Sequence, residues 1–376
     1  MLPEGPPAPF VTVVMPIRNE EAFLARCLDS VAATDYPPDR FELLILDGRS
    51  TDRSVAIAEG YRDRIPGLRV LDNPDRIQAA AFNRAVEVAR GDYVVRMDAH
   101  TLYAPDYVSR CVELLQSSGA ANVGGPQRAV GETPLTRAIA FAVSSRFGAG
   151  DASYRHTETD VWSDTVYLGA WRLDTVRSLG GMRSDWAVNE DYEFNYRLRR
   201  SGGRVLVSPS IRSTYFVRGT LAKLARQYFR YGLWKVRTLM SHPASLRLRQ
   251  TVAPAFSIYL VTLPITAWVL GWPAVTPLAA YLLALAVVTG LASRREGVTW
   301  WFLPLIYPVI HLSWGLGFRL GWLRWLPGRA ADRRGPPPRP PAGHRSADTE
   351  PGRPAASAGA PPSPEPRRPS STEARP

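Results

Sequence analysis

Short runs of β-branched and other apolar residues alternate with helical patterns between residues 9 and 219. The runs predict strands at residues 11–15, 42–46, 68–71, 93–97, 122–124 and 166–171. Apolar residues at three- and four-residue spacing predict helices between them, at 20–33, 52–64, 76–89 and 105–115. Because strands and helices alternate, we expect an α/β domain over residues 9–219, with a mostly parallel sheet flanked by helices.

A different pattern follows residue 220. Residues 250–293 are 44 consecutive residues without a formal charge, broken in the middle by Gly271, Trp272 and Pro273. A helix needs about 20 apolar residues to cross a bilayer, so we expect a helical hairpin there and a third apolar segment after it. The expected segments are 251–271, 274–293 and 298–318, in a membrane domain over 251–326. Buried helices of a soluble domain are the alternative, although such helices rarely stay uncharged for so long.

Composition distinguishes the remaining segments. Residues 221–249 hold seven Lys and Arg and no acid, interleaved with aromatic residues, which predicts a basic amphipathic helix at 220–250 on an anionic membrane surface. Residues 331–376 are rich in proline and poor in bulky apolar residues, so a disordered tail is expected, and residues 1–8 are expected to be flexible. The two cysteines, Cys27 and Cys111, cannot build a disulfide framework and are expected to be buried thiols.

The formal net charge of +12 first suggests a nucleic-acid partner. Residues 1–220, however, contain 26 basic and 28 acidic residues, a net charge of −2, while residues 221–376 contain 20 and 6, a net charge of +14. Because the positive charge flanks apolar segments, we expect membrane lipids as partners and no nucleic acid. The basic helix and Arg294-Arg295 on one side would fit the positive-inside rule. We therefore expect a multi-pass protein of the plasma membrane with its α/β domain in the cytoplasm.

The third apolar segment has two possible topologies. A full span over 298–318 would carry Arg324 and the arginines after it outside, against the positive-inside rule. Pro304 and Pro308 could instead bend the segment into a re-entrant hairpin, which would return the tail to the cytoplasm. The sequence leaves both topologies open.

Polar residues gather where three of the predicted strands end. The carboxyl ends of parallel strands meet at one edge of a sheet, and ligands of open α/β folds bind at that edge. A single carboxylate there is often only a helix cap, but three strands that end in polar residues favour a binding site. These residues are Pro16, Arg18 and Glu20 after the first strand, Asp47 at the second, and Asp98 and His100 after the fourth.

Asp98 and His100 form a possible metal-binding pair. Side chains at i and i+2 on an extended segment point the same way, so the two can share one divalent ion. Mg²⁺ favours oxygen ligands, whereas an imidazole ligand favours Mn²⁺ or another transition metal. We therefore expect a divalent metal cofactor, Mn²⁺ or Mg²⁺, at this position.

Two further groups lie on predicted helices. Glu190 and Asp191 open an amphipathic helix, where acids often only complement the helix dipole, but where a fixed carboxylate can also act as a general base. Gln227, Arg230 and Tyr231 share one face of the basic segment, and the planar guanidinium of arginine suits a diphosphate.

Together these motifs resemble the family 2 glycosyltransferases, which have the GT-A nucleotide-diphospho-sugar transferase fold. VVMPIRNEE resembles the opening strand and loop of that family, LDGRSTD its D-D-G-S-x-D stretch, MDAH its D-x-D motif, and NED its E-D base motif. RQYFRY resembles the Q-x-x-R-W motif of membrane-embedded members, and the four catalytic-domain motifs occur in the family's order. The overall layout is most similar to that of the bacterial succinoglycan-type exopolysaccharide transferases.

The resemblance implies a role for each matching residue. Asp191 matches the catalytic base, and Asp47 and Asp98 match acids that hold the nucleotide of the donor, beside Pro16, Arg18 and Glu20 of the opening loop. His100 takes the place of the second, metal-coordinating acid of D-x-D, a variant also found in the related peptide GalNAc-transferases. The residues implied near the diphosphate and the acceptor are Glu190, Gln227, Arg230 and Tyr231.

The implied activity is inverting transfer of a sugar from a nucleotide-diphosphate donor, with UDP-hexose expected first, to a polyprenyl-linked or polysaccharide acceptor. Two departures from the family pattern bear on this expectation: Gly48 replaces the second acid of D-D-G, and Tyr231 replaces a tryptophan that stacks on the growing chain of processive synthases. A polyprenyl-phosphate sugar synthase and a processive polysaccharide synthase remain alternative enzymes. A membrane scaffold without catalytic activity is the alternative of another class.

Overall fold

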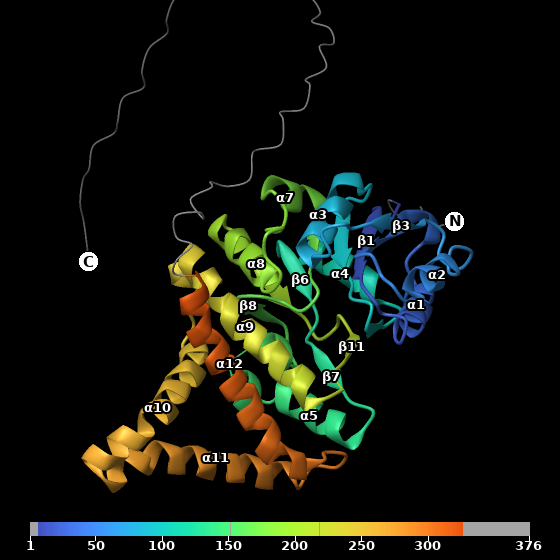
Figure 1. Ribbon diagram of the computed structural model, residues 1–376. Coiled ribbons are helices and arrows are strands. Elements are labelled where there is room, and N and C mark those ends of the chain that lie inside the picture. The colour runs from blue at the N-terminus through green and yellow to red at the C-terminus, as the bar shows by residue number, and fades with distance from the viewer. Residues whose placement is uncertain (1–6, 151, 218, 326–376) are drawn as a thin grey trace, which may run out of the picture. The chain divides into compact units, whose positions relative to one another are not determined.

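The computed structural model describes residues 7–150, 152–217 and 219–325 (Figure 1). The expected disordered tail at 331–376 lies outside the described residues, as do residues 1–6 of the expected flexible N-terminus. The described part contains a central sheet with helices on both faces, and four long helices after residue 220.

The central sheet has the strand order β3-β2-β1-β4-β9-β6-β10-β8. Its first four strands are parallel neighbours, while β9 is antiparallel to both β4 and β6, and β8 is antiparallel to β10. The strands are β1 (Val11–Ile17), β2 (Phe41–Asp47), β3 (Leu68–Asp72), β4 (Tyr93–Arg96), β6 (Asn122–Gly124), β8 (Val161–Ser163), β9 (Ala170–Arg172) and β10 (Val205–Val207). A small second sheet, β5-β11-β7, consists of β5 (Thr101–Tyr103), β7 (Arg128–Val130) and β11 (Ser213–Phe216).

Both faces of the central sheet are buried, which explains why its long strands consist mostly of apolar residues. Alternate residues of β1 and β2 pack on α1 (Leu24–Ala32), α2 (Ser54–Glu59) and α4 (Tyr107–Ser117) on one face. The intervening residues pack on α3 (Gln78–Val88), α7 (Leu173–Ser178) and α8 (Glu190–Arg200) on the other. Cys27 and Cys111 lie in the first of these cores, as expected for buried thiols.

The first three strands extend one or two residues beyond their predicted bounds, and two other strands are shorter than predicted. The strand predicted at 166–171 is present only as β9, because the backbone turns at Leu168, whose φ is +49°. The fourth strand ends at Arg96, one residue early, and residues 99–100 form a turn before β5. The three- and four-residue strands β5, β7, β8, β10 and β11 were not predicted, because they are too short to show a periodicity.

After residue 220 the chain forms α9 (Leu221–Ser241), α10 (Arg249–Leu270), α11 (Thr276–Ala292) and α12 (Leu303–Trp325). Single turns of 3₁₀ helix lie between them at Pro243–Ser245, Trp272–Val275 and Trp300–Phe302. By length and composition, three helical stretches could cross a membrane: Gln250–Leu270, Trp272–Ala292 and Trp300–Trp325. α12 is one continuous helix that contains Pro308, so no hairpin forms within it.

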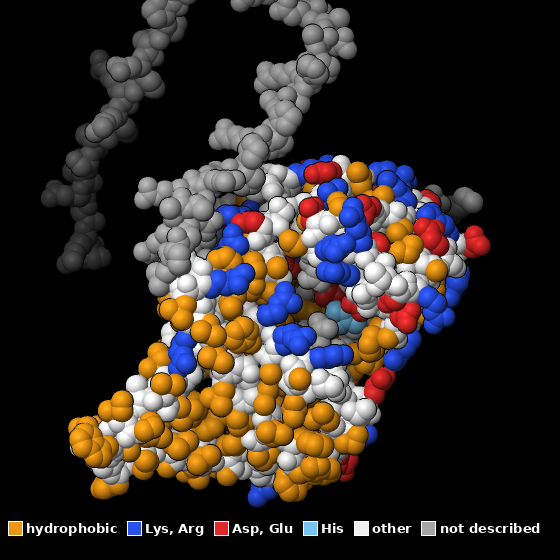
Figure 2. Space-filling view, in the orientation of Figure 1, with side chains coloured by type: hydrophobic (Ala, Val, Ile, Leu, Met, Phe, Trp, Pro, Cys, Tyr) orange, Lys and Arg blue, Asp and Glu red, His pale blue; other side chains and the backbone are white. Residues whose placement is uncertain are grey.

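Apolar side chains dominate the outer surface of these helices (Figure 2). Trp268 is 87% exposed, and many other large apolar side chains of α10 and α11 are exposed as well. A surface of this kind is larger than the apolar patches of ordinary soluble monomers and marks a lipid or protein contact. A third apolar core joins α9, α11 and α12 to α5 (Pro134–Ser144), which precedes the short helix α6 (Arg146–Ala149).

Candidate active site

The loops after β1 and β2 hold one another in place. The Asn19 amide N–H donates to Ser50 Oγ at 2.9 Å, and the Thr51 amide donates back to Asn19 Oδ1 at 2.8 Å. Asp47, at the end of β2, accepts the Ser50 amide N–H at 3.1 Å. Since Asn19 and Arg49 both have positive φ, these hydrogen bonds stabilise a strained pair of loops at the strand ends.

Asp98 and His100 lie on the turn that follows β4, not on an extended strand as expected. The Asp98 amide N–H donates to the Tyr103 hydroxyl at 2.7 Å, and that hydroxyl donates back to the Asp98 carbonyl at 3.0 Å. His100 Nδ1 lies 3.7 Å from Glu20 Oε1. The turn nevertheless places the Asp98 and His100 side chains in the lining of one pocket.

Arg96 connects the β4 end to the start of α8. Its guanidinium contacts Glu190 Oε1 at 3.2 Å, Asp98 Oδ1 at 3.5 Å and Gln78 Oε1 at 3.2 Å, and its side chain is only 8% exposed. Burial alone would lower the pKa of Arg96, but the carboxylates of Asp98, Glu190 and Asp191 raise it above its ordinary value. Burial raises the pKa of Glu190, although Arg96 opposes that shift. The Arg96 guanidinium therefore neutralises the carboxylates of Asp98 and Glu190, which would otherwise repel one another.

Asp191 is placed by the first turn of α8. Asn189, just before the helix, adopts the left-handed conformation with φ +65°. Its side-chain amide nitrogen Nδ2 donates to the Tyr231 carbonyl at 3.4 Å. Asp191 is half-buried, lines the pocket, and accepts the Tyr192 amide N–H at 2.7 Å. Arg96 forms ion pairs with Asp98 and Glu190. Asp191, in contrast, forms no ion pair within 4 Å among the described residues.

The pocket encloses about 920 Å³ and has two unlike ends. At one end lie the acidic edge of the sheet and His100, and at the other lie apolar and aromatic side chains of α10, α11 and α12, such as Phe256, Tyr281 and Trp314. The α9 residues Gln227, Arg230 and Tyr231 also line the pocket. Figure 2 shows Lys and Arg side chains around a hollow above the apolar helices.

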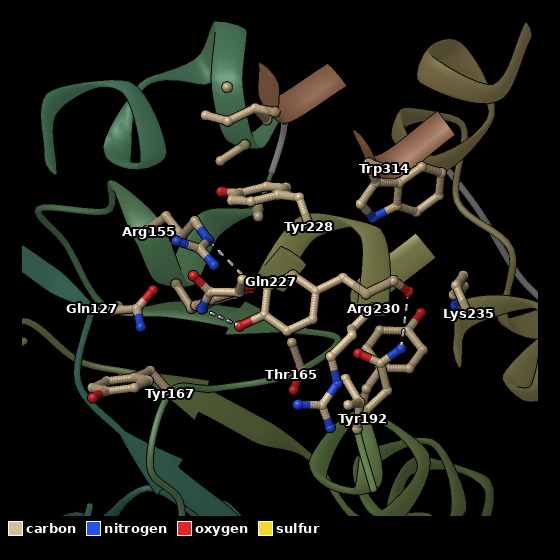
Figure 3. A pocket seen from close by; sticks show the side chains of 18 of the residues that line it. Gln127, Arg155, Thr165, Tyr167, Tyr192, Gln227, Tyr228, Arg230, Lys235 and Trp314 are labelled. Carbon is tan, nitrogen blue, oxygen red and sulfur yellow. Dashed lines mark hydrogen bonds between the residues drawn. The ribbon is translucent and has the colours of Figure 1, made fainter. Parts of the chain in front are cut away.

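Figure 3 shows the middle of this pocket. Gln227 donates to the Tyr231 hydroxyl at 2.8 Å, and an Arg230 guanidinium nitrogen lies 3.5 Å from the Ala187 carbonyl. Arg155 lies beside Gln227, donates to the Tyr154 hydroxyl at 3.3 Å, and has no carboxylate within 4 Å among the described residues. Within the part of the chain that the structure describes, no carboxylate neutralises this pocket guanidinium.

The structure brings together seven of the residues expected at the site: Asp98, His100, Glu190, Asp191, Gln227, Arg230 and Tyr231 all line the pocket. The other four, Pro16, Arg18, Glu20 and Asp47, lie outside its lining, on the neighbouring strand ends. Of these four, Glu20 approaches the pocket most directly, through its contact with His100.

Sequence reasoning missed three prominent pocket residues. Arg96 was visible as a lone charge inside a buried strand, which requires a buried partner. His311 was visible as a polar residue in an otherwise apolar segment. Arg155 gave no signal, because it lies in an irregular stretch of the chain.

The donor atoms at the acidic end fit a divalent cation. Asp98 Oδ1 is buried, lies 3.5 Å from Arg96 and accepts no hydrogen bond from the described residues, and the imidazole of His100 lines the same pocket. No cluster of three or more His, Cys, Asp or Glu side chains suited to a metal occurs in the described residues. Two protein ligands would leave coordination positions for the oxygens of a bound diphosphate, and the mixed carboxylate and imidazole set suits Mn²⁺.

Comparison with known proteins identifies the class. The model of glycosyl transferase family 2 matches residues 12–163, and that of glycosyl transferase family group 2 matches residues 93–315. The latter includes Asp98 and His100, the start of α8, α9 and most of the apolar helices. The chain belongs to the family 2 glycosyltransferases, and it is an enzyme of that class.

Two curated relatives and one solved structure illustrate the similarity. The succinoglycan biosynthesis protein ExoA of Rhizobium meliloti is 33% identical over 319 residues, which cover 81% of this chain and 93% of ExoA. A dolichyl N-acetyl-α-D-glucosaminyl phosphate 3-β-D-2,3-diacetamido-2,3-dideoxy-β-D-glucuronosyltransferase of Methanococcus voltae is 27% identical, covering 60% of this chain and 73% of that protein. The mannosyltransferase PcManGT of Pyrobaculum calidifontis, solved with GDP-Man and Mn²⁺, shares the fold with a TM-score of 0.56 at 20% identity, over 81% and 86% of the two chains.

Proposed function

We propose that this glycosyltransferase transfers a hexose from a nucleoside-diphosphate sugar to a lipid-linked glycan acceptor in exopolysaccharide synthesis. The donor that we propose first is a UDP-hexose. One observation carries the proposal: a single pocket joins the acidic residues after β4 and at the start of α8 to the apolar helices. A polar donor and a lipid-linked acceptor need such a combination of surfaces. The likeness to ExoA, whose name assigns it to succinoglycan biosynthesis, supports the acceptor class.

The donor is proposed to lie along the strand ends. Pro16, Arg18, Glu20 and Asp47 would contact the nucleoside, and Asp98 would lie near the ribose and the diphosphate, as the family resemblance implies. GDP-Man and Mn²⁺ in the PcManGT complex support a nucleotide-sugar donor. A divalent cation on Asp98 and His100 would neutralise the charge of the departing diphosphate.

Asp191 is proposed as the catalytic base. Its carboxylate would take the proton of the acceptor hydroxyl while that oxygen bonds to the anomeric carbon, and the bond from this carbon to the diphosphate oxygen would break with its electron pair. A single displacement of this kind inverts the anomeric configuration. The lack of an ion-pair partner for Asp191 among the described residues leaves its charge available for that proton.

Gln227, Arg230 and Tyr231 are proposed to lie between donor and acceptor, with Glu190 behind them. Arg230 would stabilise developing negative charge on the leaving group. Glu190 is tied to Arg96 and buried, so its proposed contribution is to fix the start of α8 and hence Asp191. The apolar helices would keep the pocket at the cytoplasmic leaflet, in the plasma membrane.

The experiment that tests the proposal is transfer by the purified full chain in lipid nanodiscs. We expect one UDP-hexose from a panel of nucleotide sugars to give a product one hexose larger on a polyprenyl-diphosphate-linked sugar, with Mn²⁺ present. Product on bare polyprenyl phosphate alone would favour a polyprenyl-phosphate sugar synthase, and a ladder of products would favour a processive synthase. Absence of any transfer with every donor and acceptor pair would contradict the proposal.

A further inference from the structure

α12 has the length and the hydropathy of a membrane span, but α9 lies directly against it. The two helices run side by side in the same direction, with Gly317 against Phe229 and Gly321 against Leu233 (Figure 1). A Cβ atom at Gly317 would lie only 2.0 Å from the Phe229 carbonyl oxygen, and one at Gly232 only 2.1 Å from the Trp314 carbonyl oxygen. Glycines at these positions allow a backbone contact that no larger residue permits.

The first half of α12 is bound to the catalytic domain itself. Leu303, Ile306 and Ile310 are fully buried in the core shared with α5. Tyr307 forms a 3.0 Å hydrogen bond with Ser145, and His311 Nε2 lies 2.8 Å from the Phe147 carbonyl. The beginning of the helix is therefore attached to residues that precede α6 or belong to it.

The last turn of α12 is also attached to the catalytic domain, through α9. The Trp325 indole N–H donates to the Leu233 carbonyl at 3.3 Å, and the Trp325 ring lies 5.2 Å from that of Trp234. Arg237 lies over the Trp325 ring at 4.8 Å and forms an ion pair with Asp185, which lies in the loop before α8. Tyr307 and Trp325 are 18 residues apart, which corresponds to about 27 Å along a helix.

This arrangement conflicts with a crossing of the membrane by α12 as a third span. The hydrocarbon core of a bilayer is about 30 Å thick, so a membrane around the whole of α12 would also surround the part of α9 that it contacts. That stretch of α9 carries Arg230 and Arg237, and the ion pair with Asp185 would enter the hydrocarbon as well. Charged side chains at that depth are strongly unfavourable.

The second half of α12 returns to the beginning of α10. Gly315 of α12 lies against the Ala253 carbonyl and Ser257 near the beginning of α10, and Arg319 donates to the Ser257 carbonyl at 3.0 Å. In Figure 1, α10 leads away from this contact, α11 connects its far end to the beginning of α12, and α12 leads back. The three helices thus trace a triangle, with entry and exit next to each other.

We infer that α12 does not cross the membrane and that Trp325 lies on the same side as the catalytic domain. The triangle of α10, α11 and α12 dips into the membrane from that side. The free face of α12, which exposes Leu305, Leu312, Leu316, Leu320 and Leu323, rests in the lipid of the adjacent leaflet. Lipid is the occupant because this face continues the exposed apolar surfaces of α10 and α11. The inference concerns topology and does not depend on which donor or acceptor the enzyme uses.

Cysteine accessibility tests the inference on the full chain. The native thiols of Cys27 and Cys111 are buried, so single cysteines at exposed positions can be labelled selectively. Glu158→Cys marks the catalytic domain and Arg324→Cys marks the end of α12. Both are treated with a membrane-impermeant maleimide, in intact cells and in inverted membrane vesicles. We expect both variants to react in the same preparation and neither in the other, and reaction of the two in opposite preparations would overturn the inference.

Two further measurements test the inference independently. The first replaces the cysteine labelling if a cysteine variant does not fold, and the second tests whether something other than lipid contacts the free face of α12. A fluorescent protein that matures only in the cytoplasm, fused after Pro376, is expected to be as bright as one fused at the N-terminus, and a dark C-terminal fusion with a bright N-terminal one would contradict the shared side. Leu316→Cys is expected to give no cross-linked dimer on oxidation in membranes. A dimer would assign the free face to a second copy and overturn the lipid contact.

Discussion

Replacement of Arg96 by methionine removes the cation that lies between two carboxylates of the pocket. In the structure this guanidinium contacts Glu190 at 3.2 Å and Asp98 at 3.5 Å, and all three side chains are nearly buried. Removal of one partner of a buried ion pair leaves uncompensated charge and typically costs about 3–5 kcal/mol. We expect a loss of this size in the free energy of unfolding, which for a chain of this length lowers the unfolding temperature by roughly 10 °C.

The loss should depend on pH, because the pKa of Glu190 is already raised by burial. A carboxyl whose pKa is higher in the folded state stabilises the fold below its unfolded pKa, and this contribution disappears as the pH rises through the folded pKa. Without Arg96 to oppose the shift, that pKa rises further, so the Arg96→Met variant should be closer to the parent at pH 5 than at pH 8. Adding Glu190→Gln should restore much of the lost stability at pH 8.

The assay is thermal unfolding in detergent, followed by tryptophan fluorescence at both pH values. Arg64→Met is the matched control, because Arg64 pairs with Asp29 at 2.6 Å while both side chains are 54% exposed, and such pairs contribute about 0–1 kcal/mol. Equal stability of Arg96→Met and Arg64→Met, or a loss at pH 8 that Glu190→Gln does not reduce, would refute the reasoning.

Three further predictions concern packing, metal and thiols. Gly317→Leu should separate α9 from α12 and lower the unfolding temperature, whereas Gly290→Leu should not, since no atom of the described residues lies within 4 Å of a Cβ at Gly290; equal unfolding temperatures would contradict the helix contact. His100→Asp should shift the metal that best supports nucleotide binding, measured by calorimetry, from Mn²⁺ toward Mg²⁺, and an unchanged preference would remove His100 from the metal site. Cys27 and Cys111, whose thiol pKa values burial raises, should resist iodoacetamide at pH 8 until the protein is unfolded, and rapid labelling of the folded protein would contradict their burial.

The long parallel strands were predictable because their pattern is strong and local. β1 and β2 are mostly apolar on both faces, so their positions in the chain and their place in a mostly parallel sheet follow from burial in an α/β domain. The antiparallel placement of β9 between β4 and β6 was not predictable, since a three-residue strand carries no periodicity and its position depends on the turn at Leu168. Local sequence determines an element well only when the element is long enough to show its period.

The same limit applies to the pocket. The residues at strand ends and at the start of α8 could be found because secondary structure alone places them near one edge of the sheet. His311 stood out as a polar residue in an apolar segment, but its place in the pocket and that of Trp314 could not be predicted, because both reach it only through the packing of α12 on α9 and α6. Hydropathy identified α12 as a membrane segment. The sequence shows that α12 contains glycines, but not that these glycines pack against α9.

The central claim is that Asp191 takes the proton of the acceptor in sugar transfer. The most direct test compares Asp191→Asn with the parent in a transfer assay, while calorimetry follows binding of the nucleoside diphosphate. Asp174→Asn is the control, because Asp174 is also an acid in the first turn of a helix but is exposed and lies outside the pocket. The account predicts that Asp191→Asn reduces transfer by about 10²- to 10⁴-fold or more with nucleotide binding retained, and that Asp174→Asn leaves both unchanged. Transfer by Asp191→Asn at the rate of the parent would contradict it.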